Sequence, residues 1–127
     1  MQNQKSALGL DGNITALIGY LIGIVALVLI FIEKDNKFVR FHAFQSVFLA
    51  VAYIVCLILM VILGIVVAII GQMSGVLGTI LGLVMMLLWL AVIVGFLGAL
   101  IYSAIKAYGG NMFKLPIIGN MAEKFSA

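Results

Sequence analysis

The chain has very little charge: of its 127 residues, 7 are Lys or Arg and 4 are Asp or Glu. By contrast, 66% are hydrophobic and 14 more are glycine, so about three-quarters of the chain is apolar, against about half in soluble domains. A soluble domain of this size buries only about two-thirds of the surface that its unfolded chain exposes. The composition therefore excludes a soluble fold and predicts an all-α integral membrane protein.

Cysteine and histidine are equally scarce, with one of each. Cys56 lies deep in an apolar run, so a single chain can form neither an internal disulfide nor a thiolate metal site. His42 has no carboxylate in the later apolar segments to complete a metal coordination shell. We expect no metal, no cofactor and no catalytic residue. We also expect no nucleic-acid partner, because the few basic residues flank apolar spans as they do in membrane proteins.

The uncharged segments indicate the membrane spans. Residues 12–32 and 41–105 contain no Asp, Glu, Lys or Arg. A helix needs about 20 residues to cross a hydrocarbon core of about 30 Å, so the longer segment must fold back, and 71–75 (GQMSG) is the best turn. The sequence predicts a single membrane domain over residues 1–127, a small bundle of three transmembrane helices, with four as the alternative. The predicted helices are about 14–32, 43–70 and 76–105, with a cytoplasmic loop at 33–42 and an amphipathic, interfacial cytoplasmic tail at 106–127.

The distribution of Lys and Arg predicts the orientation. With three spans, the loop and the tail share one side of the membrane and carry six of the seven basic residues, and only Lys5 lies on the other side. Cytoplasmic loops carry an excess of Lys and Arg. We therefore expect the N-terminus outside and the C-terminus in the cytoplasm.

Small residues at four-residue spacing indicate where helices approach one another closely. Gly19 and Gly23 share a face of the first predicted helix, and Gly95 and Ala99 share a face of the third. Packing within one bundle is one interpretation of these stripes. A contact between two copies of the chain is the other.

The segment 33–46, EKDNKFVRFHAFQS, concentrates the polar side chains. Asp35 or Asn36 can cap the second helix by accepting hydrogen bonds from its free amides. Two overlapping sets of candidate residues follow. The candidate interaction loop for a partner consists of Glu33, Lys34, Asn36, Lys37, Arg40, His42 and Gln45, and a candidate polar ridge consists of His42, Gln45, Ser46 and Tyr53. The ridge either hydrogen-bonds to neighbouring helices or lines a groove for a ligand, a proton or a translocated segment.

The C-terminal tail contains residues that interrupt or end helices. Gly109 and Gly110 end the third helix, and Pro116 favours an extended residue before it. Asn120 followed by Glu123 resembles a capping box for a short last helix. The candidate tail motif is Lys114, Pro116, Gly119 and Glu123. We expect this tail to lie along the membrane interface, where its lysines approach anionic headgroups.

The 33–46 loop and the closing FKLPIIGNMAEK segment resemble the Tic-twenty-like family of small membrane proteins, relatives of a chloroplast inner-envelope protein import component. This family includes many bacterial and archaeal members. The resemblance implies a multi-pass helical protein of a prokaryotic plasma membrane, with a link to protein translocation. The positions that carry it are Glu33, Lys34, Asn36, Arg40, His42, Gln45, Lys114, Pro116, Ile118 and Gly119.

These observations predict a non-enzymatic protein, a scaffold or subunit of a membrane complex. Its partners are then the lipid bilayer and either another membrane protein or a second copy of the chain. The alternative is a homo-oligomeric pore or a transporter of small solutes or ions, lined by the polar ridge. An enzyme is disfavoured, because the later spans lack the charged acid and base groups that membrane catalysis uses.

Overall fold

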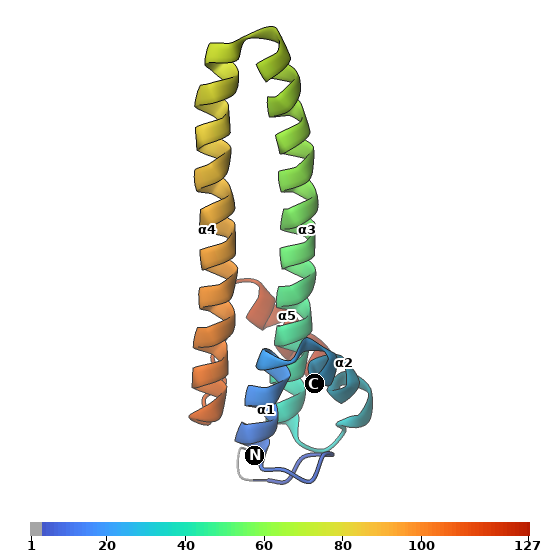
Figure 1. The fold of residues 1–127 in the computed structure, drawn as a ribbon. Coiled ribbons are helices and arrows are strands. Elements are labelled where there is room, and N and C mark those ends of the chain that lie inside the picture. The colour runs from blue at the N-terminus through green and yellow to red at the C-terminus, as the bar shows by residue number, and fades with distance from the viewer. Residues whose placement is uncertain (1–3) are drawn as a thin grey trace. The chain divides into compact units, whose positions relative to one another are not determined.

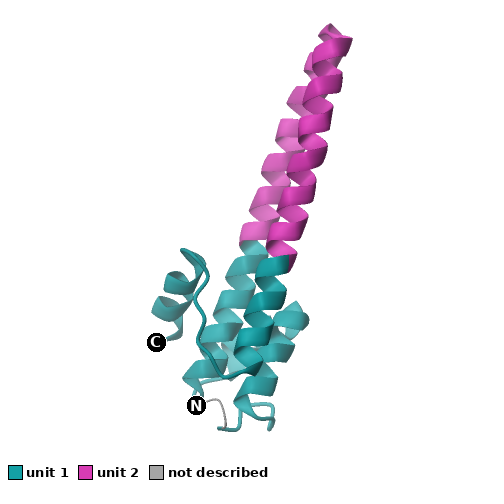
Figure 2. Ribbon diagram, turned by 90° about the vertical axis from the view of Figure 1, so that its left-hand side faces the viewer, with its two compact units in different colours: residues 1–51, 98–127 teal, residues 52–97 magenta. Residues whose placement is uncertain are grey.

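The computed structural model describes residues 4–127, and within them the regular secondary structure is helical, apart from one isolated β-bridge between Lys5 and Asp11. The helices fall into two compact units, which are coloured separately in Figure 2: unit 1 comprises residues 1–51 and 98–127, and unit 2 comprises residues 52–97. The helices are α1 (Gly12–Leu21), α2 (Gly23–Ile32), α3 (Lys37–Met73), α4 (Gly75–Tyr108) and α5 (Ile118–Ser126) (Figure 1).

Unit 2 is a pair of antiparallel helix segments from α3 and α4, joined at Ser74 within the glycine-rich segment 71–75. The Tyr53 and Phe96 rings lie 5.2 Å apart between their centroids. Near the turn, a Cβ built on Gly78 would lie 2.6 Å from the Cα of Gly71. The two backbones therefore touch at the turn, where only glycine fits, and they separate enough for aromatic rings further along.

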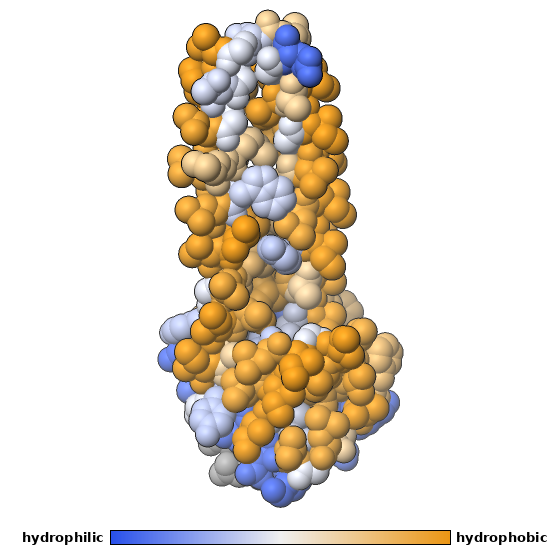
Figure 3. Space-filling view, viewed as in Figure 1, coloured by the Kyte–Doolittle hydropathy of each residue, from blue (hydrophilic) through white to orange (hydrophobic). Residues whose placement is uncertain are grey.

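The outer surface of unit 2 is apolar. Leucine, isoleucine and valine side chains project from both helices around most of their circumference. On the face drawn in Figure 3, the strongly hydrophilic colour within this unit lies at the turn. The helices α3 and α4, with 37 and 34 residues, are the two described helices long and apolar enough to cross a membrane. An all-helical fold with two candidate spans is thus what the structure supports, and a three-span bundle is not confirmed.

The predicted first span, residues 14–32, is instead two helices of ten residues, α1 and α2, broken at Ile22. Ile22 has an extended backbone, with φ −124° and ψ 96°. A Cβ on Gly19 would lie 3.7 Å from Leu29 Cδ1 and 3.8 Å from Ala26 Cβ. In one straight helix, residues 19 and 29 would lie about 15 Å apart along the axis. The chain therefore folds back at Ile22 into a helical hairpin.

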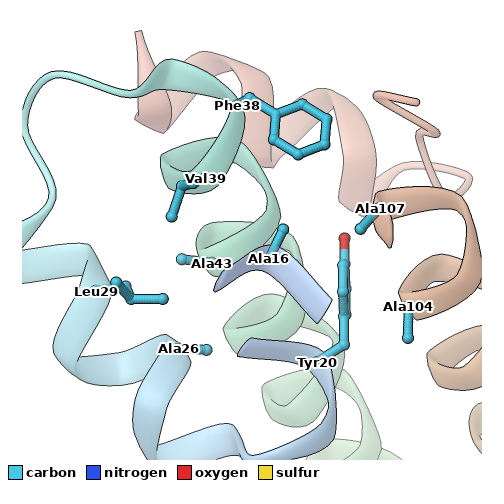
Figure 4. Packing of buried hydrophobic residues seen from close by; sticks show 9 residues of the cluster. All are labelled: Ala16, Tyr20, Ala26, Leu29, Phe38, Val39, Ala43, Ala104 and Ala107. Atoms are coloured by element: carbon cyan, nitrogen blue, oxygen red, sulfur yellow. The ribbon is translucent and has the colours of Figure 1, made fainter. Parts of the chain in front are cut away.

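The core of unit 1 lies where this hairpin meets α3 and the end of α4. Figure 4 shows its side chains directed toward one another from these four helices. Several of them are alanines, which allow the helix backbones to approach closely. The buried cluster consists of Ala16, Tyr20, Ala26, Leu29, Phe38, Val39, Ala43, Ala104 and Ala107.

Replacing Gly78 by alanine is expected to destabilise unit 2, because the new Cβ would overlap the Gly71 backbone. Overpacking of this kind costs about 1 to 3 kcal/mol. Gly95→Ala is the matched control, since nothing lies within 4 Å of its Cβ position and alanine favours a helix over glycine by about 0.5 to 1 kcal/mol. Thermal unfolding in detergent should give a lower Tm for G78A only. Equal Tm values would contradict the close packing at the turn.

Candidate functional site

The C-terminal segment after α4 is fastened to α3 by the side chain of Gln45. Its Nε2 donates a hydrogen bond to the Phe113 carbonyl at 2.9 Å, and its Oε1 accepts one from the Leu115 amide at 3.0 Å. The amide group thus pairs with the extended backbone of residues 113–115 as a neighbouring strand would. Both ends of the amide are used, which fixes its orientation.

A chain of hydrogen bonds continues from Gln45 through Tyr20 to His42. Gln45 Nε2 donates to the Tyr20 hydroxyl at 2.7 Å, and that hydroxyl lies 2.7 Å from His42 Nδ1. His42 Nε2 lies 3.1 Å from the Asn111 carbonyl oxygen. A carbonyl only accepts, so Nε2 donates to it, and in the neutral ring Nδ1 accepts from the Tyr20 hydroxyl. We call Tyr20, His42 and Gln45 the polar latch; each is at most 1% exposed.

The local sequence explains why the latch forms. Residues three positions apart share one face of a helix, so His42 and Gln45 both face the C-terminal segment from α3. The segment is extended because α4 stops at two glycines, and Gly110 has the left-handed φ of 83°. The amide of Asn111 bonds back to the Lys106 carbonyl at 2.9 Å, and that of Gly110 to the Ala107 carbonyl at 3.0 Å, which closes the helix end.

The next polar residue of α3 holds the hairpin. The Ser46 hydroxyl donates to the Gly19 carbonyl at 2.9 Å, close to the end of α1, where helix carbonyls lose their partners. His42, Gln45 and Ser46 therefore bond to neighbouring segments of unit 1. Tyr53, the fourth residue of the predicted ridge, belongs to unit 2, where its ring packs against Phe96.

The charged loop is shorter than predicted, and several of its polar side chains form hydrogen bonds with nearby backbone groups. It spans residues 33–36, since α3 begins at Lys37 rather than near Ala43. Asn36 is the cap: its Oδ1 accepts from the amides of Phe38 and Val39 at 3.1 and 3.3 Å. This capping brings the residues up to His42 into the helix.

Glu33 is a buried carboxylate, 2% exposed. It accepts hydrogen bonds from the backbone amides of Ala7, Asp35 and Asn36 at 2.7, 3.3 and 3.1 Å. Arg40 Nη1 donates to the carbonyls of Glu33 and Ile30 at 3.0 and 3.2 Å. Of the predicted interaction loop, only Lys34 and Lys37 are exposed.

The residues of the tail motif contact one another within the C-terminal segment. Lys114 pairs with Glu123, and a Cβ on Gly119 would lie 2.6 Å from the Lys114 Cα, so glycine is required there. The predicted capping box of Asn120 and Glu123 is wrong: α5 begins at Ile118 without a side-chain cap. Glu123 turns instead to the lysine.

Aromatic packing attaches α5 to α3. The Phe125 ring lies 6.5 Å from that of Phe44 and 5.7 Å from that of Phe48, between centroids. These phenylalanines belong to the predicted aromatic stripe of α3. The stripe therefore serves in part as a docking face for the last helix of the same chain.

The predicted packing glycines differ in their surroundings. Gly19 lies against α2, as described above, whereas nothing lies within 4 Å of a Cβ on Gly23 or Gly95. Ala99 is partly buried. The stripe at Gly95 thus faces outward from unit 2, and the one at Gly19 closes the hairpin.

Sequence reasoning missed Tyr20 as a site residue. A tyrosine within an apolar helix needs a hydrogen-bond partner for its hydroxyl, and this was the available signal. The carbonyls of Asn111 and Phe113 gave no signal, because backbone partners carry no side-chain identity.

Most of the described carboxylates form an ion pair or accept hydrogen bonds from backbone amides. Asp11 pairs with Lys5 at 2.7 Å, and Glu33 and Glu123 have the partners described above, which leaves Asp35 exposed. Among residues 4–127, no group of three or more His, Cys, Asp or Glu side chains is placed to hold a metal ion. The arrangement of the latch is structural: it joins α1, α3 and the C-terminal segment.

Comparison with known proteins identifies the family. The model of the magnetosome magnetite crystal formation protein family matches residues 5–122. A UPF0132 membrane protein of Methanocaldococcus jannaschii is 36% identical over 123 residues, which cover 96% of this chain and 94% of the relative. A second from that organism is 32% identical over 122 residues, covering 94% and 73%. One from Archaeoglobus fulgidus is 32% identical over 113 residues, covering 88% and 92%.

The chain therefore belongs to the magnetosome magnetite crystal formation protein family, and it is a membrane protein like these relatives. The resemblance to the Tic-twenty-like family is wrong, because the matching model covers the 33–46 loop and residues 113–122 of the tail segment on which it rested. In this structure, residues such as Asn36 and Gln45 cap a helix and fasten the chain. No solved structure matches the chain at a comparable level of similarity.

Replacing Gln45 by leucine is expected to release the C-terminal segment. The change removes the partners of the Phe113 carbonyl and the Leu115 amide, and each buried polar group left unpaired costs about 1 to 3 kcal/mol. Hydrogen exchange should therefore accelerate at Leu115 and through α5. Ser46→Ala is the matched control, because it removes a bond from the next residue of α3 to α1 and should leave exchange in the tail unchanged. Full protection of Leu115 in Q45L would contradict the role of the latch.

Proposed function

We propose that this member of the magnetosome magnetite crystal formation protein family is a non-enzymatic scaffold of a membrane-bound assembly. It crosses the membrane twice, through α3 and α4. Unit 1 then forms a cytoplasmic platform that contains both chain termini and engages a protein partner.

The observation that carries this proposal is the separation of charge. All 11 charged residues of the sequence lie in unit 1, and residues 52–97 contain none. Because Lys and Arg gather on the cytoplasmic side, two spans would place all seven basic residues there. The three-span arrangement would leave Lys5 outside. The proposed orientation therefore differs from the one expected from the sequence, with the N-terminus now in the cytoplasm of a prokaryotic cell.

The hydrogen bonds of unit 1 also support a scaffold over a pore. His42, Gln45 and Ser46 are used in joining segments of the chain, so they do not form a free polar lining. The same commitment argues against acid or base catalysis by His42. Exposed charged side chains without an ion pair remain around the start of α3, at Lys34, Asp35 and Lys37, and on α5, at Lys124. We assign the partner contact to the group around the start of α3.

The description of the family refers to magnetite crystal formation in magnetosomes. We do not carry over from it a mineral-binding role for this chain. Three of the four carboxylates are engaged by lysine or by backbone amides, which leaves Asp35 as the exposed acid without such a partner.

Cysteine labelling tests the topology. In a Cys56→Ala background, single cysteines replace Leu8, Gln72 or Ala127, and intact cells are treated with a membrane-impermeant thiol reagent. Positions 8 and 127 should be protected, and position 72 should react. Labelling of position 8 but not of position 127 in intact cells would restore the three-span arrangement and contradict the proposal.

Purification in mild detergent tests the scaffold. The native protein is expected to co-purify with a specific larger membrane protein, and the triple change Lys34→Ala, Asp35→Ala, Lys37→Ala should remove most of that partner. These side chains are exposed, so the fold should persist. Gln72→Ala, an exposed change in unit 2, is the control and should keep the partner. A native protein that purifies alone would contradict a scaffold.

A further inference from the structure

The α1–α2 hairpin is too short to cross a bilayer. Each helix has ten residues and so measures about 15 Å, half of a hydrocarbon core of about 30 Å. The chain turns back at Ile22, and the segments before α1 and after α2 both belong to unit 1. The hairpin therefore enters and leaves on the same side.

The exposed surface of the hairpin is apolar, and its base is charged. Ile24, beside the turn, is 76% exposed, and Phe31, further along α2, is 69% exposed. At the base, Lys5 pairs with Asp11 before α1, and residues 33–35 after α2 are Glu, Lys and Asp. Other large apolar side chains exposed here are Leu21, Ile22, Leu27, Val28 and Ile32. An apolar tip on a charged base is the pattern of a segment inserted into a membrane from one side.

Hydrogen bonds within the chain satisfy several backbone groups at the break between α1 and α2. The Ile22 amide bonds to the Ile18 carbonyl at 2.8 Å, and the Ile22 carbonyl accepts from the Val25 amide at 3.0 Å. Ser46 satisfies the Gly19 carbonyl. Non-helical backbone is tolerated at membrane depth where it is buried in protein or lines a water-filled cavity. These hydrogen bonds satisfy part of the backbone at the turn, namely the amide and carbonyl of Ile22 and the carbonyl of Gly19.

The long helices leave room for the hairpin at the membrane surface. With 37 and 34 residues, α3 and α4 measure about 55 and 50 Å, more than a whole bilayer with its headgroups, about 40 to 45 Å. Their ends in unit 1 must therefore reach the headgroup level. There, the hairpin packs against the first turns of α3.

We propose that the α1–α2 hairpin inserts into only the leaflet on the side of the chain termini, with the upper acyl chains of that leaflet as its partner. This one-sided insertion makes the protein accumulate in membranes that are convex on that side. The inference rests on the two-span topology proposed above. It goes beyond the scaffold role, because it assigns the protein a preferred membrane shape.

The geometric reason is an imbalance between the leaflets. The leaflet that holds the hairpin contains α1 and α2 in addition to the two spans, whereas the other contains the spans alone. Two helices of about 10 Å diameter add about 160 Å² of cross-section to one leaflet. Insertion at the boundary of headgroups and acyl chains is known to respond to curvature.

Depth-dependent quenching tests the insertion. In a Trp89→Phe background, a single tryptophan replaces Ile24, Leu8 or Ile58, and the protein is reconstituted in phosphatidylcholine vesicles with bromine at a shallow or a deep chain position. Position 24 should be quenched most by shallow bromine, position 58 most by deep bromine, and position 8 by neither. An unquenched position 24 would overturn the proposal, whether water or a second copy of the chain covers the tip.

Sorting into membrane tubes tests the curvature preference. A cysteine at position 127 in the Cys56→Ala background is labelled with an impermeant dye, so that only copies with outward termini are followed in giant vesicles. These copies should be enriched about twofold or more in tubes pulled outward, as expected for a curvature-sensitive insertion. The double change Ile24→Asn, Phe31→Asn alters exposed side chains and should abolish the enrichment, whereas Leu8→Asn should not.

The outcomes separate this inference from the topology beneath it. Absence of enrichment with position 24 still quenched would overturn the curvature preference alone. Reaction of position 72 on the same side as position 127 would overturn the topology. Enrichment that survives the double change would assign the curvature preference to another part of the chain and overturn the role of the hairpin.

Discussion

Unit 1 depends on one constraint: a backbone group that is removed from water must find a hydrogen-bond partner within the protein. The chain leaves regular helical structure at Ile22, at 33–36 and after Tyr108, and each departure leaves amides or carbonyls unpaired. Ser46, Asn36 and the pair of His42 and Gln45 supply partners at these three places. Loss of one of these side chains costs more than the hydrogen bond itself, because it leaves a buried backbone group without a partner.

All of these side chains come from the start of α3 or its cap, and this explains why the polar residues are concentrated there. One amphipathic stretch meets the hairpin on one side and the C-terminal segment on the other. Asn36 fixes where the helix begins, so it also sets the rotation of His42, Gln45 and Ser46 about the helix axis. Three residues of the predicted polar ridge, His42, Gln45 and Ser46, form the contact surface of three segments of one chain.

The sequence predicts those features that depend on local chemistry. The helical membrane class follows from composition, the turn near Gly71 follows from glycine and polar residues, and Asn36 is one of the two caps considered. The break at Ile22 was not predictable from local pattern, because no proline or charge interrupts residues 14–32. It depends on close contact between Gly19 and α2 and on a hydroxyl from a helix 27 residues later. Likewise, the tail of Lys114 and Glu123 forms an ion pair rather than a capping box, since backbone contact at Gly119 places the two side chains together.

The side chains whose hydrogen bonds hold the fold also limit where the protein can bind a partner. A side chain that holds the fold cannot also give up its hydrogen bonds to a ligand without the cost of exposing its former partner. The latch and Glu33 are therefore poor candidates for binding, although they are the most conspicuous polar residues in an apolar chain. The surface of unit 1 offers exposed charged side chains, at Lys34, Asp35 and Lys37 around the start of α3 and at Lys124 on α5, and the apolar outer side of the hairpin. The first suits a protein and the second suits lipid, so a scaffold that joins a partner to one face of a membrane uses both.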